Sequence, residues 1–184
     1  MTDVELSPKN FKQWLFGLYL DKERYSKFEE VQKLFNAKPF EFGELGFSHD
    51  KGQTEIMVKK GAVRLPISRM GSGLQQILFL IATVVVYKNK LLGIEELEIN
   101  LSPKAQKEIF EILKKYVNSS PNVLDQVIIT SHSDYFEDRE DVKCFAVELN
   151  QQESSSKIGP WEEKKRERHF MGKRVVPTGG WEWD

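Results

Sequence analysis

The sequence has little of what would mark a disulfide-linked or membrane-bound protein. Its one cysteine, Cys144, excludes an internal disulfide, and the apolar residues around it predict a small buried hydrophobic side chain rather than a nucleophile. No apolar run approaches the ~18 residues that a membrane helix needs. No basic region leads into an apolar run at the N-terminus, as it would in a signal peptide. We therefore expect a cytoplasmic protein with no membrane partner.

The sequence also lacks an excess of charge and a phosphate loop. Its formal net charge of −1 argues against a global electrostatic grip on nucleic acid. The pattern G-x-x-x-x-G-K-[ST], which marks a P-loop, does not occur; the only Gly-Lys pair is Gly172-Lys173, and Arg174 follows it. The composition that remains is ordinary, 40% hydrophobic and 30% charged over 184 residues, and fits one domain with a sizeable core.

The N-terminal third predicts two helices and a hairpin. A helix is expected from Pro8, with Ser7 as its N-cap. A second helix is expected over residues 22–35, with an apolar face made of Tyr25, Phe28, Val31 and Leu34. Residues 55–58 and 62–67 are typical of strands that turn near Gly61, which predicts a β-hairpin.

A glycine-rich turn, Gly71-Ser72-Gly73, then leads into an apolar helix at residues 77–86. Free N–H groups and the helix dipole at such a turn form an anion site, and glycines let the backbone approach a ligand closely. The alternative is a flexible N-cap in front of a core helix.

The stretch from Leu91 to Leu101 is an apolar run that ends in the carboxylate pair Glu95 and Glu96. A helix over residues 103–117, capped by Ser102, and a second apolar strand over residues 125–131 follow it. Strand, helix and strand predict a right-handed βαβ unit with two parallel strands. Glu95 and Glu96 follow the first strand and His132 follows the second. We therefore expect them at the same edge of the sheet, where ligands of α/β proteins bind. A further strand at residues 142–149 is expected as the next or edge member of that sheet.

Three pieces now stand in one order: Gly71-Ser-Gly-Leu-Gln-Gln76, Ile94-Glu-Glu-Leu-Glu-Ile-Asn-Leu101 and Ile128-Ile-Thr-Ser-His-Ser133. Over residues 54–149 the chain resembles the C-terminal half of an ABC/SMC-like ATPase head. Such heads occur in the overcoming-lysogenization-defect and RecF-like AAA ATPases of prokaryotic DNA repair and phage defence. The resemblance implies an α/β fold with a partly parallel sheet and flanking helices. We expect residues 1–53 to form a helical lead-in and residues 150–184 a polar, charged tail.

The resemblance also implies ATP and Mg²⁺ as cofactors and a role for each motif. Ser72, Gly73 and Gln75 match the signature motif, which contacts the γ-phosphate of an ATP held by the opposite protomer. Glu95 matches the acid that holds Mg²⁺, commonly through water, and Glu96 matches the base that orients the attacking water. His132 matches the switch histidine. Asn100 and Leu101 fall where the family has its D-loop, which contacts the other protomer.

Departures from the family pattern make an incomplete ATPase the first hypothesis. The P-loop is missing, Leu97 stands where proline is common, and Ser102 stands where histidine is common. Alone, the chain should bind ATP poorly. It would need a complementary P-loop half or a head-to-tail dimer partner, and a nuclease or DNA are further possible partners.

Interpretations without a catalytic role also stay open. Glu95 and Glu96 could be acids of a surface loop, His132 could be structural, and Glu98 is expected to make only a local contact. The chain could instead be a non-catalytic interaction module that docks onto an ATPase or nuclease. A third alternative is a nucleic-acid-binding domain that uses basic residues near the hairpin and in the tail, namely Lys59, Lys60, Arg64, Arg69 and residues 164–168.

Overall fold

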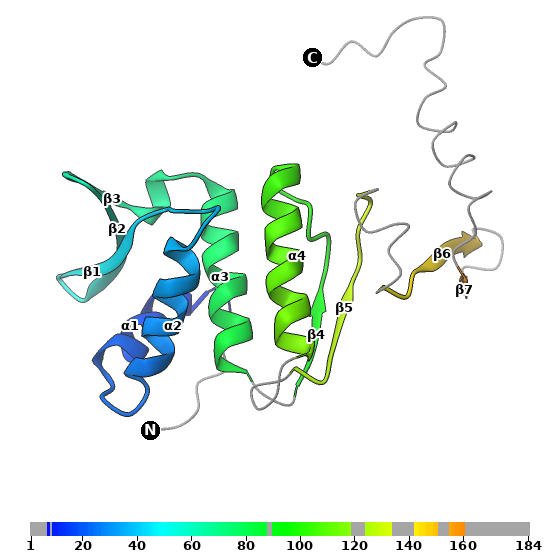
Figure 1. Cartoon of the computed structure of the whole chain (residues 1–184), viewed down its shortest axis with the longest axis horizontal. Coiled ribbons are helices and arrows are strands. Elements are labelled where there is room, and N and C mark those ends of the chain that lie inside the picture. Colours follow the sequence, from blue (N-terminus) through cyan, green and yellow to red (C-terminus); the bar gives the residue numbers. More distant parts are fainter. Residues whose placement is uncertain are drawn as a thin grey trace, which may run out of the picture. The chain divides into compact units, whose positions relative to one another are not determined.

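The computed structural model describes residues 7, 9–87, 90–118, 124–133, 142–150 and 155–160 (Figure 1). The chain forms two compact units, Met1–His132 and Ser133–Asp184. The described residues form helices and small β-sheets, in agreement with the expected α/β class. The domain boundary at residue 150 stays a prediction. In the part of the chain that is described, no helix has the length and apolar character needed to span a membrane.

Two helices open the first unit, and both begin later than expected. Helix α1 is Phe11–Leu20 and helix α2 is Tyr25–Asn36. The N-cap of α1 is Asn10 rather than Ser7, without a side-chain capping bond, and the Asn10 carboxamide oxygen accepts the Ser7 N–H at 2.8 Å in the turn before the helix. Before α2, the Asp21 carboxylate accepts the N–H groups of Glu23 and Arg24, at 3.0 and 3.4 Å, in an Asx turn. In both places local side-chain bonds hold a turn where the sequence predicted helix.

The buried face of α2 also differs from the prediction. Phe28, Val31 and Phe35 are buried, whereas Tyr25 is exposed and Leu34 is half-buried. Phe28, Val31 and Phe35 are spaced i, i+3 and i+7 and so lie on one face of the helix, whereas Leu34 lies beside that face. Phe16 and Tyr19 of α1 and Phe28 of α2 pack against Phe47 of the neighbouring sheet, with ring centroids 5.1–5.8 Å apart.

That sheet is antiparallel, with strands β1 (Glu44–Asp50), β2 (Gln53–Lys60) and β3 (Val63–Pro66) in this order. The predicted hairpin around Gly61 is confirmed: Lys60 pairs with Val63. Strand β1 was not predicted. It joins β2 through Lys51 and Gly52, whose φ angles of 47° and 78° are the left-handed values of a two-residue hairpin turn.

Helix α3 (Ser72–Val86) lies between α2 and α4 (Figure 1) and forms the centre of the unit. It begins at Ser72, five residues earlier than the predicted apolar helix, so the predicted glycine-rich turn is in fact its first turn. Its second half is apolar around most of its circumference, which is typical of a helix packed on several sides. The buried residues are Ile77, Leu78, Leu80, Ile81, Ala82, Thr83, Val84 and Val85.

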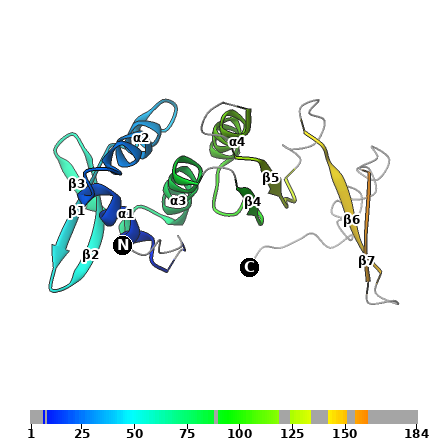
Figure 2. The ribbon, with the colours of Figure 1, turned by 90° about the horizontal axis from the view of Figure 1, so that it is seen from below.

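Strand β4 (Leu91–Ile94), helix α4 (Pro103–Asn118) and strand β5 (Gln126–Ile129) form the predicted βαβ unit. The strands pair in parallel, with Leu91 opposite Gln126 and Ile94 opposite Ile129. The predicted cap of α4 is confirmed, since the Ser102 hydroxyl accepts the Ala105 N–H at 3.3 Å. The apolar face of α4 buries Ile109, Phe110, Leu113 and Tyr116, and Ile112 is half-buried. Figure 2 shows α4 over one face of the two-stranded sheet.

In the second unit, β6 (Phe145–Asn150) pairs antiparallel with β7 (Ser155–Pro160). The prediction that this strand extends the parallel sheet is therefore wrong: its partner is β7, which the polar sequence after Asn150 did not indicate. Cys144 is half-buried, so it is less enclosed than predicted. The basic tail at residues 164–168 lies outside the described residues.

Candidate functional site

The acid pair follows β4 directly and starts a compact turn. Glu95 and Glu96 are both exposed. The Glu96 N–H donates to the Thr130 hydroxyl at 3.2 Å, and the Thr130 N–H donates to the Ile94 carbonyl oxygen at 2.9 Å. These two bonds tie the start of the turn to the chain just beyond β5, so the ends of both strands form one structure.

The backbone of this turn departs from ordinary conformations at two positions. Glu96 has a φ of 49° and Asn100 a φ of 60°. The left-handed region costs a residue with a Cβ roughly 1–2 kcal/mol, and asparagine tolerates it better than glutamate does. The turn is anchored by Leu97, which has no exposed surface, and by Leu101, which is buried. Buried neighbours therefore hold the exposed Glu96 in a backbone conformation that it would otherwise seldom adopt.

The turn brings Glu96 next to His132. Their Oε1 and Nε2 atoms are 3.9 Å apart, and the two side chains are 48% and 67% exposed. An exposed pair of this kind adds little to stability, about 0–1 kcal/mol. The pair matters because of its position. A carboxylate and an imidazole, both able to accept or donate protons, face each other at the carboxyl ends of adjacent parallel strands.

Glu98 makes the shortest hydrogen bonds of the turn. Its Oε2 accepts the Ser131 hydroxyl and its Oε1 accepts the His132 backbone N–H, both at 2.6 Å. Partial burial raises the pKa of Glu98, but the bonds from Ser131 and His132 outweigh that effect and hold the pKa below its usual range. Glu98 was expected to make only a local contact, and instead it reaches residues 33 and 34 positions away.

The glycine-rich turn meets the acid turn at Gly73. A Cβ added at Gly73 would lie 2.2 Å from the Asn100 carbonyl oxygen, so only glycine lets the first turn of α3 approach so closely. Gly71, at a φ of 89°, is the N-cap residue of α3. Ser72 is exposed and Gln75 is half-buried. The structure thus brings Gly73 alongside the predicted D-loop residue Asn100, within one chain.

The donor set suits a metal that keeps most of its water. Among the described residues, no group of three or more His, Cys, Asp or Glu side chains could hold a metal ion. Mg²⁺ is commonly bound through one or two carboxylates together with waters and substrate phosphates. The exposed carboxylates of Glu95 and Glu96 fit that manner of binding, and they do not form a closed protein cage.

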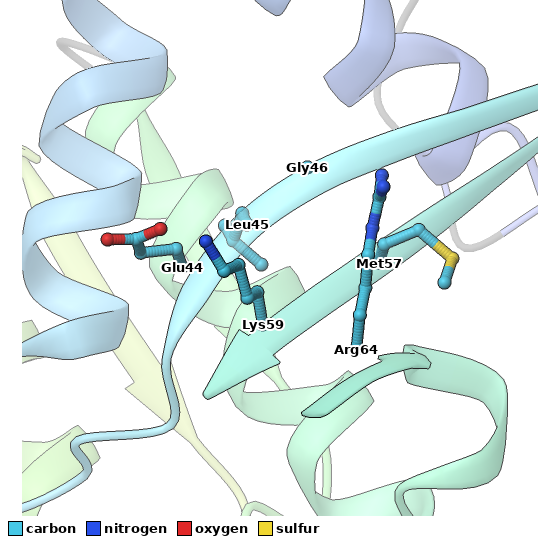
Figure 3. Close-up of a pocket in the computed structure, with 6 residues that line it drawn as sticks. All are labelled: Glu44, Leu45, Gly46, Met57, Lys59 and Arg64. Carbon is cyan, nitrogen blue, oxygen red and sulfur yellow. The ribbon is translucent and has the colours of Figure 1, made fainter. Parts of the chain in front are cut away.

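Two surface hollows lie elsewhere, on the β1–β2–β3 sheet. Figure 3 shows the smaller one, of about 170 Å³, with the side chains of Glu44 and Lys59 at one end and Arg64 beside Met57 at the other. It is below the ~300–1,000 Å³ of typical ligand sites. The other hollow, of about 520 Å³, is lined by Asn36, Glu41, Gly43, Glu44, Lys59, Lys60 and Gly61. Neither includes a residue of the acid turn.

Sequence reasoning placed Glu95, Glu96 and His132 correctly at the strand ends but missed Thr130 and Glu98. The signal for Thr130 was its place directly after β5, where polar residues of parallel strands gather. Glu98 had no comparable signal, because its partners are far away in the sequence.

A family model described as AAA ATPase domain matches residues 5–136. The chain belongs to this AAA ATPase family. The match includes the glycine-rich turn, the acid turn and His132. The match suggests an ATP-binding domain. AAA ATPase domains in general use ATP with Mg²⁺ and commonly work in oligomers.

The sequence is also similar to part of a longer protein. An uncharacterized protein of Methanocaldococcus jannaschii is 29% identical over 122 residues, which is 66% of this chain and 14% of that protein. The chain therefore spans about one seventh of the relative's length.

Proposed function

We propose that this chain supplies the acid and switch residues of an ATP-hydrolysing site whose P-loop is contributed by another segment or chain. The observation that carries the proposal is the pairing of Glu96 with His132, 3.9 Å apart, where β4 and β5 end. Both backbones are held there, because the Glu96 N–H donates to the Thr130 hydroxyl and the His132 N–H donates to the Glu98 carboxylate.

Each side chain has a role in this proposal. Glu96 accepts a proton from the attacking water or orients that water, which is the work of a general base. His132 contacts the terminal phosphate from the neighbouring strand end. Glu95 holds Mg²⁺, commonly through water; when bound, the ion neutralises phosphate charge. Ser72, Gly73 and Gln75 at the start of α3 contact the γ-phosphate of an ATP held by the opposite protomer.

The missing P-loop makes the proposal conditional on a partner. Backbone amides and the lysine of a P-loop hold the β- and γ-phosphates, and this sequence has no such motif. The chain is then active only with a complementary P-loop half or in a head-to-tail dimer with one. A prokaryotic ATPase of DNA repair or phage defence is the setting we propose.

Glu96→Gln tests the catalytic role in the protein assembled with its P-loop segment. Because general-base catalysis contributes about 10²–10⁴-fold, the variant should lose at least ~100-fold in turnover while retaining ATP binding. Glu95→Gln should instead raise the Mg²⁺ concentration needed for activity. Glu44→Gln, at an exposed glutamate outside the turn, is the matched control and should leave turnover unchanged. Unchanged turnover in Glu96→Gln would remove that residue from its role.

A non-catalytic interaction module is the second candidate, and the outer face of the β4–β5 sheet favours it. On that face Leu91 is 60% and Ile128 is 49% exposed, although parallel sheets are normally covered on both faces. Turnover of ATP by the assembled protein decides between the two candidates, because only the first one predicts it.

The nucleic-acid alternative has less support. Lys60 donates to the Glu41 carbonyl oxygen and Arg64 to the Phe47 carbonyl oxygen, and glutamates lie among these cations. A steep loss of DNA affinity with added salt would revive it.

A further inference from the structure

Glu98 connects the turn after β4 with the chain after β5. Its two carboxylate oxygens are used on two successive residues, the hydroxyl of Ser131 and the backbone N–H of His132, each at 2.6 Å. Hydrogen bonds to an ionised acceptor are about twice as strong as those between neutral groups. The carboxylate therefore holds the backbone of His132 directly and the side chain of the residue before it, Ser131.

The same turn presents Glu96, two residues before Glu98. The His132 side chain is 67% exposed, and its Nε2 lies 3.9 Å from the Glu96 Oε1. Its backbone N–H is held by Glu98. A largely exposed imidazole could otherwise adopt several positions, since exposed side chains change rotamer readily. The position at which Glu98 holds the His132 backbone therefore decides whether the imidazole ring reaches Glu96.

We propose that Glu98 is a positioning residue that sets the imidazole of His132 against the Glu96 carboxylate. The inference rests on the proposed catalytic function of these two residues. A merely structural role would require only that Ser131 and His132 have some hydrogen-bond partner, and water could serve at an exposed strand end. Instead, both residues bind the two oxygens of one half-buried carboxylate, whose hydrogen bonds offset the cost of burying its charge.

The first test measures hydrogen exchange of the His132 amide by NMR in the chain alone. Glu98→Ala should speed exchange by about tenfold or more, as expected when a hydrogen bond to a charged acceptor is lost. Glu98→Gln, which retains one acceptor oxygen, should have a smaller effect. Ser131→Ala removes one of the two contacts and keeps the test available if Glu98→Ala does not fold. Glu44→Ala is the control for loss of a carboxylate, and it should leave the exchange rate unchanged.

The second test measures turnover in the protein assembled with its P-loop segment. Glu98→Ala should lower kcat by about tenfold or more and leave the KM for ATP within about twofold, with partial rescue in Glu98→Gln. Because Glu98 acts through His132, the double variant with His132→Ala should lose no more kcat than His132→Ala alone.

The outcomes separate this inference from the proposed function. Faster exchange with unchanged kcat, unchanged exchange, or additive losses in the double variant would each overturn the positioning role. Full activity in Glu96→Gln would instead overturn the proposed function, and the exchange experiment would still report whether Glu98 holds His132.

Discussion

Gly73→Ala is the substitution whose effect follows most directly from the structure. The new Cβ would lie 2.2 Å from the Asn100 carbonyl oxygen and 3.3 Å from its carbonyl carbon. Both atoms are backbone, so no flexible side chain can move aside. Either the first turn of α3 or the acid turn must shift, and the acid turn is held by Leu97 and Leu101 in the core.

Two opposing effects set the magnitude. Replacing glycine by alanine inside a helix normally stabilises by roughly 0.5–1 kcal/mol. Forcing an extra carbon into a packed contact costs typically 1–3 kcal/mol, and the separation here is far below van der Waals contact. The net expectation is a loss of about 1–2 kcal/mol in the free energy of unfolding. For a unit of this size, that loss corresponds to a fall in Tm of roughly 4–7 °C.

Gly17→Ala is the matched control, because Gly17 also lies within a helix and a Cβ added there meets nothing within 4 Å. Urea unfolding followed by circular dichroism should show Gly17→Ala to be more stable than wild type and Gly73→Ala to be less stable. If Gly73→Ala is neutral or more stable, the close approach of the two turns does not exist as described.

Three further predictions concern pH and packing. The pKa of Glu98 is lowered in the folded protein, so its carboxylate stabilises the fold fully above the ordinary carboxyl pKa of about 4.3. This stabilisation is lost as the pH falls through the lowered pKa. Urea unfolding should therefore show that the difference in stability between wild type and Glu98→Gln shrinks in acid. Burial and the hydrogen bond to Glu30 raise the pKa of Tyr116, so ultraviolet titration should show a tyrosine that ionises only as the chain unfolds, and this step should be absent in Tyr116→Phe. Leu97→Ala should cost about 2–5 kcal/mol of unfolding free energy, whereas Ile99→Ala, at a 47% exposed position in the same turn, should stay within about 0.5 kcal/mol; equal losses would contradict the packing described.

The βαβ unit was predictable because local signals agree there. The short apolar strands, the cap at Ser102 and the 3.6-residue periodicity of α4 all indicate the same elements. The hairpin at Gly61 was predictable for the same reason. Polar residues directly after each strand were enough to bring Glu95, Glu96 and His132 to one edge, since parallel strands end on the same side.

Other elements depend on contacts that the sequence does not display. Helices α1 and α2 start late because Asn10 and Asp21 bind nearby N–H groups and hold turns. Strand β1 was missed because its connection to β2 uses Lys51 in a left-handed conformation, where glycine or asparagine is the usual signal. The pairing of β6 is decided by β7, whose serine-rich start does not resemble a strand.

Within the site, the long-range contacts were the unpredictable part. Glu98 reaches Ser131 and His132 only because the parallel strands bring the two turns together. Gly73 is constrained by Asn100, a residue on another element, and not by the turn in which it lies.

The central claim is that the acid turn and His132 belong to an ATP site completed by a P-loop from elsewhere. The most direct measurement is a titration with labelled ATP and Mg²⁺, performed on this chain alone and on the chain co-expressed with a segment that carries G-x-x-x-x-G-K-[ST] and its preceding strand. We expect no saturable binding to the isolated chain up to millimolar ATP, and saturable binding to the assembly. Tight, saturable binding to the isolated chain, or no binding to any assembly that contains a P-loop, would contradict it.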